Sequence, residues 1–335
     1  MAANITFSEG SGVNNSIYGN SQSPVRMIIE KRGEAFEQES IVKQIFKTDK
    51  SEHWSEKYTG LTGMSGFQAV GENGAYPTDG QEEGYSTVLA AVTWKDSFSL
   101  SREMIEDTKS LDLRQKPLGF VTAYYRTREK FGAALIGGAI KGDASLSFAS
   151  NHFSLKTADG QNLFYSAHPN KITGSTQCNL YSDDFSSDAL GQLEVVMQNT
   201  MGDNDEILDV APDTILIPNQ HALKKAVFAA VGADKDPETA NNGFNYQFGR
   251  WNIIVWPYLN QFITSGTSPW VLLDSRYNKD YGSLIWLDRV ALDVKSTVDD
   301  NTDANVWRGY ARFTAGFHDW RGIACAGVSG ATSLP

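Results

Sequence analysis

The hydrophobic pattern is strongest between Leu113 and Ile140, LRQKPLGFVTAYYRTREKFGAALIGGAI. Apolar or long side chains recur there at spacings of three and four residues, which places them on one face of a helix: Val121, Tyr124, Arg128, Phe131 and Leu135. Off this stripe lie Arg126, Glu129 and Lys130. Pro117 suits a first turn, and Gly137-Gly138 ends the pattern. About 24 helical residues would span roughly 36 Å. The stretch therefore predicts a long helix that braces a large flat subunit, the alternative being an ordinary core helix of an enzyme.

The N-terminal region predicts an arm. Residues 1–23 are rich in Gly, Ser and Asn and carry hardly a charge, so we expect them not to order by themselves and to drape over another surface. From Arg26 to Lys47, apolar residues appear among Glu and Lys, and the part from Ser40 onward fits a short amphipathic helix. The arm should thus end in an apolar patch.

The next region predicts a projecting hairpin. Phe67–Val70 reads as a short strand, and Tyr85–Leu100 is a β-rich run with aromatic residues. The turn formers and acidic residues between them, Gly71–Gly84, leave little to bury. Because a two-stranded hairpin is marginal in water, we expect support from a neighbouring surface such as another subunit. The alternative is a disordered surface insertion.

Shorter elements surround the long helix. Ser101–Lys109 predicts a short helix capped by Ser101, with Met104 and Ile105 facing inward. Beyond Ile140 the pattern allows a long ordered loop at best, with aromatic anchors at Phe148, Phe153, Phe164 and Tyr165. A second helix is predicted at Ser187–Met201, stopped by Gly202, with Leu190, Leu193, Val196, Met197 and Met201 on one face.

The C-terminal part alternates strands with a helix, which indicates an α+β fold. The strands are expected at Asp213–Pro218, Trp251–Pro257, Trp270–Asp274, Gly282–Asp288 and Val306–Phe317. Asn219 would cap the helix, whose inner residues are Ala222, Leu223, Ala226, Val227 and Val231. In Val306–Phe317 the residues Trp307, Gly309, Ala311 and Phe313 alternate with Arg308, Tyr310, Arg312 and Thr314. This pattern predicts a half-buried antiparallel strand.

Composition narrows the function classes. The chain has 335 residues, of which 41% are hydrophobic, enough for a substantial core in one large or two ordinary domains. Its formal charge of −11 argues against a broad nucleic-acid-binding face. Cys178 and Cys325 are the only cysteines, so neither a disulfide framework nor a zinc cluster is supported, and a reducing compartment is expected. We expect neither signal-peptide export nor a membrane span.

The sequence supports no catalytic chemistry. Ser65 in GMSGF has Phe67 where a nucleophile elbow needs glycine. The acidic loop from Asp299 resembles the start of a calcium loop, but Ala304 and Tyr310 replace the required Gly and Glu, so a solvated turn is predicted. The histidines show no ligand spacing, and His168 before Pro169 is interpreted as a turn residue. We therefore predict no catalytic, cofactor-binding or metal-ligating residue, no cofactor, and no enzymatic function.

The order of these parts resembles that of the major capsid proteins of tailed bacteriophages with the Hong Kong 97-type fold. The polar arm through Lys47 resembles the N-arm of that family, the hairpin around Gly71–Gly84 its E-loop, and Leu113–Ile140 its spine helix. DGQNLFYSAHPN, Asp159–Asn170, is similar to a segment after the spine helix in a Mu-like branch of head subunits. The strands and helix of Asp213–Phe317 resemble the axial domain with its return strands.

The resemblance implies an α+β fold divided into five parts. These are an N-arm (1–57), an E-loop hairpin (58–100), a peripheral domain with the spine helix and following loop (101–200), an axial domain (201–300) and return strands (301–335). It also implies hexamers and pentamers that close into an icosahedral shell around the genome. The implied partners are further copies of the chain, a separate scaffolding protein, a portal and packaged double-stranded DNA, without a membrane. The chain would be made in the bacterial host cytoplasm and reside in the virion.

Two departures modify this expectation. No long helical leader precedes the arm, so assembly would need a separate scaffold or none. The hairpin tip contains no Lys, the nearest being Lys57 and Lys95, so no covalent cross-link between subunits is predicted. Two alternatives remain at this point. One is an encapsulin-like shell of a bacterial nanocompartment, which shares the fold. The other is a soluble α+β enzyme of unknown chemistry, which predicts a small oligomer and a deep apolar pocket.

Overall fold

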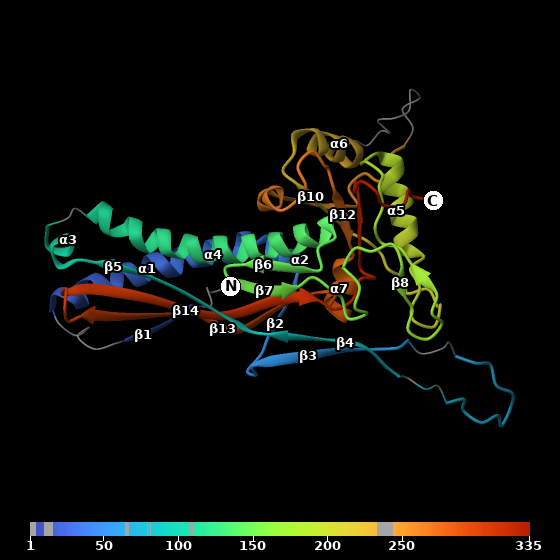
Figure 1. Ribbon diagram of the computed structural model, residues 1–335, viewed down its shortest axis with the longest axis horizontal. Helices are drawn as coiled ribbons and strands as arrows, with labels where there is room; N and C mark the ends of the chain where they lie inside the picture. Colours follow the sequence, from blue (N-terminus) through green and yellow to red (C-terminus); the bar gives the residue numbers. More distant parts are fainter. Residues whose placement is uncertain are drawn as a thin grey trace.

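A long helix lies along an elongated sheet at one end of the molecule, a second sheet with flanking helices forms the other end, and a hairpin projects beyond the body (Figure 1). The computed structural model describes residues 5–9, 16–63, 67–78, 80, 82–107, 110–232 and 244–335. The mixture of helices and sheets agrees with the α+β prediction.

The predicted long helix is confirmed as α4, Ser110–Lys141. Phe131 and Leu135 of its stripe are completely buried. Two details of the prediction were wrong. The helix begins earlier, so Pro117 lies inside it, and it continues through Gly137 and Gly138. These glycines allow close packing instead: a Cβ on Gly137 would lie 2.5 Å from Cβ of Phe262, and one on Gly138 would lie 2.7 Å from Cδ1 of Leu155.

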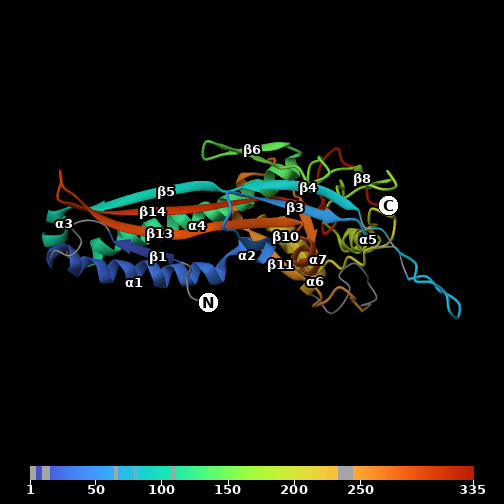
Figure 2. The ribbon, with the colours of Figure 1, turned by 90° about the horizontal axis from the view of Figure 1, so that it is seen from below.

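Helix α4 covers one face of a five-stranded sheet. The strands of this sheet are, in spatial order, β1 (Ile5–Glu9), β13 (Leu284–Asp299), β14 (Ala304–Phe317) and β5 (Val92–Leu100). Strand β2 (Lys47–Lys50) pairs with the start of β13. Trp307, Ala311 and Phe313 of β14 are buried and Arg308 is exposed, as the alternation predicts. Thr314, expected on the polar side, is buried. In Figure 2 strands β5, β14 and β13 cross in front of α4.

The N-terminal residues are more ordered than composition suggests. Strand β1 runs parallel to β13, and α1 (Ser16–Glu39) lies along α4 with Val25 and Ile29 buried. The prediction of an unordered stretch was therefore wrong for residues 5–9 and 16–23, and residues 1–4 and 10–15 lie outside the described residues. The short helix predicted after Ser40 is confirmed as α2, Ile41–Ile45.

The hairpin projects as predicted, but its strands differ. Strand β3 (Ser55–Leu61) pairs with β4 (Glu83–Ala90), whereas Phe67–Val70, expected as a strand, is an exposed non-strand segment. Ser55–Leu61 was missed because its pairing partner lies far along the chain. The described residues between the two strands extend away from the body (Figure 1).

Small elements connect the long helix to the second sheet. Helix α3 (Arg102–Asp107) is confirmed, and Oγ of Ser101 accepts a hydrogen bond from the backbone N of Met104 at 3.2 Å. The segment predicted as a loop contains two hairpins, formed by β6 (Ser145–Phe148) with β7 (Asn151–Ser154) and by β8 (His168–Pro169) with β9 (Thr176–Gln177). Of its predicted anchors, Phe153 and Phe164 are buried, Phe148 is half-buried and Tyr165 is exposed.

The second sheet has four strands in the order β11-β10-β12-β15. They are β10 (Thr214–Pro218), β11 (Asn252–Trp256), β12 (Trp270–Leu273) and β15 (Ile323–Ala326), with η1 (Pro257–Gln261) beside them. The flanking helices are α5 (Ser187–Gln198), α6 (His221–Gly232) and α7 (Ser275–Tyr281). Helix α5 ends before the predicted stop at Gly202, because the chain leaves the helix at Asn199. Ala222, expected inside α6, is exposed.

The chain passes between the two sheets more than once. Strand β13, which starts in the part expected as the axial domain, runs in the long sheet beside α4. Strand β15, from the last part of the chain, pairs with β12 at the edge of the four-stranded sheet. These crossings place the ends of both sheets close to the base of the hairpin.

Candidate functional site: the junction beneath the hairpin

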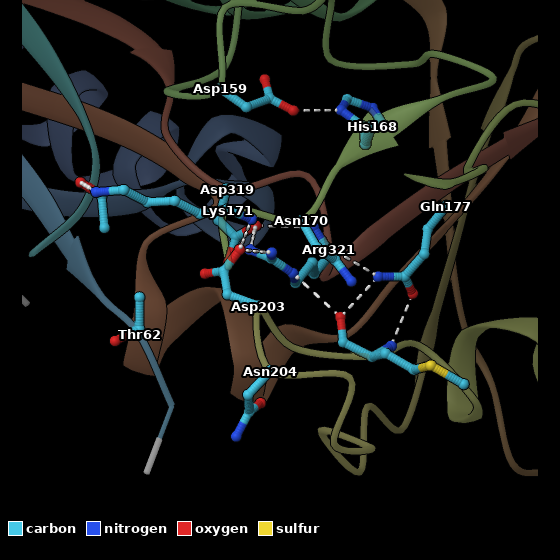
Figure 3. A network of polar contacts seen from close by, with 12 residues as sticks. Thr62, Asp159, His168, Asn170, Lys171, Gln177, Asp203, Asn204, Asp319 and Arg321 are labelled. Atoms are coloured by element: carbon cyan, nitrogen blue, oxygen red, sulfur yellow. Dashed lines mark hydrogen bonds and ion pairs between the residues drawn. The ribbon is translucent and has the colours of Figure 1, made fainter. Parts of the chain in front are cut away.

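The base of the hairpin rests on a polar network that joins segments far apart in the sequence (Figure 3). We call this network the hairpin junction; its members are Thr62, Asp159, His168, Asn170, Lys171, Gln177, Asp203, Asn204, Asp319 and Arg321. The sequence predicted no functional side chain here. The junction residues come from the base of the hairpin after β3, from the segment after α4 that contains β8 and β9, from the loop after α5, and from the turn between β14 and β15.

Lys171 connects the junction to the hairpin itself. Its ammonium group donates to the carbonyl oxygens of Glu83 and Gly84, where β4 begins, with 3.2 Å to that of Gly84. The same ammonium lies 5.6 Å from the ring centroid of Tyr85. The backbone N of Lys171 donates to Oδ1 of Asp203 at 2.9 Å. A single side chain therefore fixes the start of β4 against the body.

An ion-pair network lies behind Lys171. Nη2 of Arg321 is 2.7 Å from Oδ1 of Asp203, and Nη1 is 3.3 Å from Oδ1 of Asp319. Burial alone would lower the pKa of Arg321, but the carboxylates of Asp319 and Asp203 outweigh burial and raise it. The hydroxyl of Tyr277 donates to Asp319 at 2.7 Å. The buried charge of Arg321 thus has opposite partners, and removal of either carboxylate would leave it less well compensated.

His168 is the most deeply buried member. Its Nδ1 lies 2.7 Å from Oδ2 of Asp159, and its ring stacks on Trp320 with centroids 4.3 Å apart. Burial would raise the pKa of Asp159, but hydrogen bonds from His168, Thr157 and the backbone of Gln161 lower it overall. The interpretation of His168 as a turn residue was wrong, because it lies in strand β8 and is completely buried.

Two amides and a carboxylate hold the loop after α5. Gln177 donates to the carbonyl oxygen of Met201 at 2.9 Å and accepts from its backbone N at 2.8 Å. Asn170 donates to Oδ1 of Asp205 at 2.7 Å and accepts from Gln177 at 2.8 Å. These contacts order the loop that carries Asp203.

Two glycines of the paired strands, Gly60 and Gly84, lie against each other above the junction. The pairing of β3 and β4 shifts between Thr59 and Leu61, and a Cβ on Gly84 would lie 2.9 Å from the carbonyl carbon of Gly60. This contact requires a residue without a side chain. A cavity of about 140 Å³ lies beneath, lined in part by His318, whose pKa is lowered by burial. The hairpin is thus closely pinned at its base.

Of the described features that the sequence analysis weighed for chemistry, His168 belongs to the junction and the acidic loop from Asp299 does not. Ser65 lies outside the described residues. Asp299 accepts hydrogen bonds from the backbone N of Asn301 at 3.3 Å and the hydroxyl of Thr302 at 2.8 Å, which confirms a turn. Cys178 and Cys325 are both free. Over the described part of the chain, no group of three or more His, Cys, Asp or Glu side chains could hold a metal ion, and no helix there could cross a membrane.

Comparison with known proteins points to one class of protein. A family model described as phage capsid protein matches residues 84–326. The fold is similar to the capsid protein of Ralstonia phage GP4, with a TM-score of 0.53, 10% identity, and coverage of 86% of this chain and 90% of that chain. The capsid of a native GTA particle gives a TM-score of 0.51, 11% identity, and coverage of 87% and 89%. No curated protein matches the sequence.

Proposed function

The chain belongs to the phage capsid protein family, and we propose that its hairpin and hairpin junction join neighbouring subunits of the head shell. It is a major capsid protein with the Hong Kong 97-type fold, it self-associates into the shell, and it resides in the virion. The role of this family is structural. The resemblance noted from the order of parts is therefore confirmed.

The finer assembly is part of the proposal. The subunits form hexamers and pentamers that close into an icosahedral shell. A separate scaffolding protein and a portal act with them, and double-stranded DNA is packaged inside. The segment Asp159–Asn170 supports placement in the Mu-like branch, and the structure gives that segment a role, because Asp159 and His168 pair within the junction.

We also propose roles for the five parts of the chain. Residues 1–57 act as the N-arm, 58–100 as the E-loop, 101–200 as the peripheral domain, 201–300 as the axial domain and 301–335 as return strands. Support for this division comes from α4 with the long sheet at one end and from α5, α6 and the four-stranded sheet at the other. In this division, β13 pairs within the long sheet of the peripheral domain, and β15 pairs within the four-stranded sheet of the axial domain.

One observation carries the assembly role of the hairpin. The hairpin is fixed at its base, yet the described residues beyond it are exposed. Phe67 and Tyr76 have relative exposures of 112% and 95%, which is unusual for aromatic side chains of a lone subunit. Since an isolated two-stranded hairpin is marginal in water, a contact with another subunit accounts for both features.

Electron microscopy of the purified full-length chain tests this function. We expect capsomers or closed shells of many copies, with or without a co-expressed scaffolding protein. A monodisperse monomer or dimer under every salt and scaffold condition would contradict the proposal. Shells that form but contain only protein cargo, with no DNA after infection, would place the chain among nanocompartments instead.

A further inference from the structure

A cavity of about 250 Å³ lies between α4 and the long sheet, and we call it the helix–sheet cavity. Four aromatic rings line it: Trp94 on β5, Phe120 and Tyr124 on α4, and Phe313 on β14. Protein interiors contain few voids larger than a water molecule, whereas an engineered apolar cavity of about 150 Å³ takes up benzene. The helix–sheet cavity is therefore large enough for a small organic molecule.

Small residues keep this space open. Gly309 on β14 has no side chain, and a Cβ there would lie 2.4 Å from Cζ of Phe120. Ala123 on α4 and Ala311 on β14 line the cavity with a single methyl group each. An unfilled cavity lowers the stability of a protein, because its walls lack contacts on one side. A bound molecule of matching shape would restore those contacts.

A carboxylate lies at the edge of the helix–sheet cavity. Along β5, Trp94 and Phe98 pack against the core on the side of α4, so Asp96 between them points to the same side. Asp96 is exposed, and its partner across the sheet is Gly309, which has no side chain to cover it. Among the described residues, Asp96 accepts one hydrogen bond, from the backbone N of Ser97 at 2.8 Å, and forms no ion pair within 4.0 Å.

Three nearby cations are directed elsewhere. Lys95 also borders the cavity, but as the next residue on the strand it points to the opposite face of the sheet. Lys116 donates to the carbonyl oxygen of Ser99 at 2.7 Å. Arg128, whose guanidinium lies over two of the aromatic rings, is paired with Asp288 at 2.9 Å. The cavity thus combines aromatic walls with a carboxylate that has no ion-pair partner.

This combination favours one kind of cation. Aromatic faces attract cations, and aromatic side chains are the usual means by which proteins bind quaternary ammonium groups. A primary ammonium needs acceptors for three hydrogen bonds, whereas a quaternary ammonium donates none. The two hydroxyl groups in the lining are already engaged: that of Thr127 donates to the carbonyl oxygen of Ala123 at 2.8 Å, and that of Tyr124 accepts from Arg128 at 3.1 Å. The lining therefore suits a quaternary ammonium better than a primary one.

We propose that the helix–sheet cavity binds a small molecule that carries a compact quaternary ammonium group. The methylated nitrogen lies among the aromatic rings, and the carboxylate of Asp96 supplies the opposite charge at the edge. The bound molecule contacts both α4 and the long sheet, so it stabilises the folded subunit. The site lies within one subunit, and the inference goes beyond the proposed function without depending on it.

Isothermal titration calorimetry of the unassembled full-length subunit with choline tests the site. The comparison ligand is the neutral alcohol in which a tert-butyl group replaces the trimethylammonium group, because it has the same shape without the charge. Choline should bind about tenfold more tightly than this alcohol, and more tightly than ethanolamine, which carries a primary ammonium. Equal affinities for choline and the neutral alcohol, or no binding of choline, would overturn the proposal.

Two variants test the residues. Asp96→Asn keeps an oxygen for the hydrogen bond from Ser97 and removes the charge, so it should weaken choline binding about threefold to tenfold and leave binding of the alcohol unchanged. Asp143→Asn, the same change at an exposed position beyond the end of α4, is the matched control and should alter neither. Ala123→Leu fills the cavity, so it should abolish binding of both ligands while the circular dichroism spectrum stays that of the parent. Equal effects of the two Asp→Asn changes, or full binding by a folded Ala123→Leu subunit, would overturn the proposal.

Assembled shells separate this site from a contact between subunits. Because the cavity lies within one subunit, shells should bind choline with the affinity of free subunits. Loss of binding on assembly would assign the cavity to a contact between copies and overturn the proposal. A parent that binds choline but never assembles would leave this inference standing and overturn the proposed function instead.

Discussion

Replacing Arg128 by Met should destabilise the subunit by about 3–5 kcal/mol, because it leaves a carboxylate without its partner inside the protein. Arg128 projects from α4 and is 7% exposed. Its Nη1 and Nη2 lie 2.9 and 3.0 Å from the two carboxylate oxygens of Asp288 on β13. The guanidinium carbon is also 4.8 Å from the ring centroid of Trp286 and 5.1 Å from that of Phe313. This side chain therefore ties the long helix to the long sheet.

The magnitude follows from what remains after the substitution. Burial alone would lower the pKa of Arg128, but Tyr124 and Asp288 raise it overall, so the side chain is charged in the folded state. Without it, Asp288 keeps only the hydrogen bond from Nε1 of Trp286, at 3.0 Å, among its described side-chain contacts. Arg128→Met with Asp288→Asn removes both charges and keeps an oxygen acceptor for Trp286. The double variant should recover most of the lost stability.

Chemical denaturation of unassembled subunits, followed by circular dichroism, measures these free energies. The matched control is Arg126→Met, an exposed position on the same helix, which should change stability by less than about 0.5 kcal/mol. The reasoning would be refuted if Arg128→Met and Arg126→Met shifted the midpoint equally. It would also fail if the double variant were as unstable as the single one.

Three further outcomes are expected. Phe131→Asp places an unpaired carboxylate at a completely buried position, so soluble yield should collapse, and an unchanged melting temperature would mean that the packing of α4 is wrong. Boiled shells should migrate as single subunits on a denaturing gel, since the nearest lysines, Lys57 and Lys95, lie outside the hairpin tip, and a covalent ladder would contradict this. Burial lowers the pKa of His318 below its ordinary 6.5, so this histidine is protonated more readily in the unfolded chain than in the folded one. The free energy of unfolding should therefore fall as the pH drops below about 6.5. His318→Asn should flatten this pH dependence, and an identical profile in both proteins would assign it to other groups.

Elements with their own periodicity were predictable. Helix α4 has a continuous stripe of large side chains, and β14 alternates buried and exposed residues over most of its length, so local patterns identified both. Helix α1 was missed because its first turns are polar and contain Pro24, and its buried residues Val25 and Ile29 face α4, which lies far along the chain. The same reason applies to Ser55–Leu61, a polar strand that depends on β4 for its pairing.

The hairpin junction was beyond prediction for a related reason. Arg321 and Asp203 are 118 residues apart in sequence, and only the crossing of the chain between the two sheets brings them together. Asp159 and His168 are nearer, nine residues apart, but no spacing rule describes a pair across an irregular loop. The sequence feature that pointed to this region was the segment Asp159–Asn170, which resembles a segment of head subunits. Its role as the base of the hairpin required the fold.

The central claim is that the hairpin is needed for assembly of the shell but not for folding of the subunit. Removing the hairpin tests this claim most directly. Replacing residues 65–80 by a short Gly-Ser turn keeps the hydrogen bonds between Thr62 and Glu82, and the residues it removes are exposed wherever the structure describes them, at 67–78 and 80. The subunit should therefore fold as the parent does. Assembly should fail, because even about 1 kcal/mol per intersubunit contact is repeated throughout a closed shell.

The measurement is sedimentation velocity of this variant and the parent side by side, with circular dichroism to establish that both are folded. The account predicts a parent-like spectrum together with isolated subunits or capsomers that do not close. Shells of normal size from the variant would contradict the assembly role of the hairpin. Loss of the folded spectrum would contradict its independence from the core.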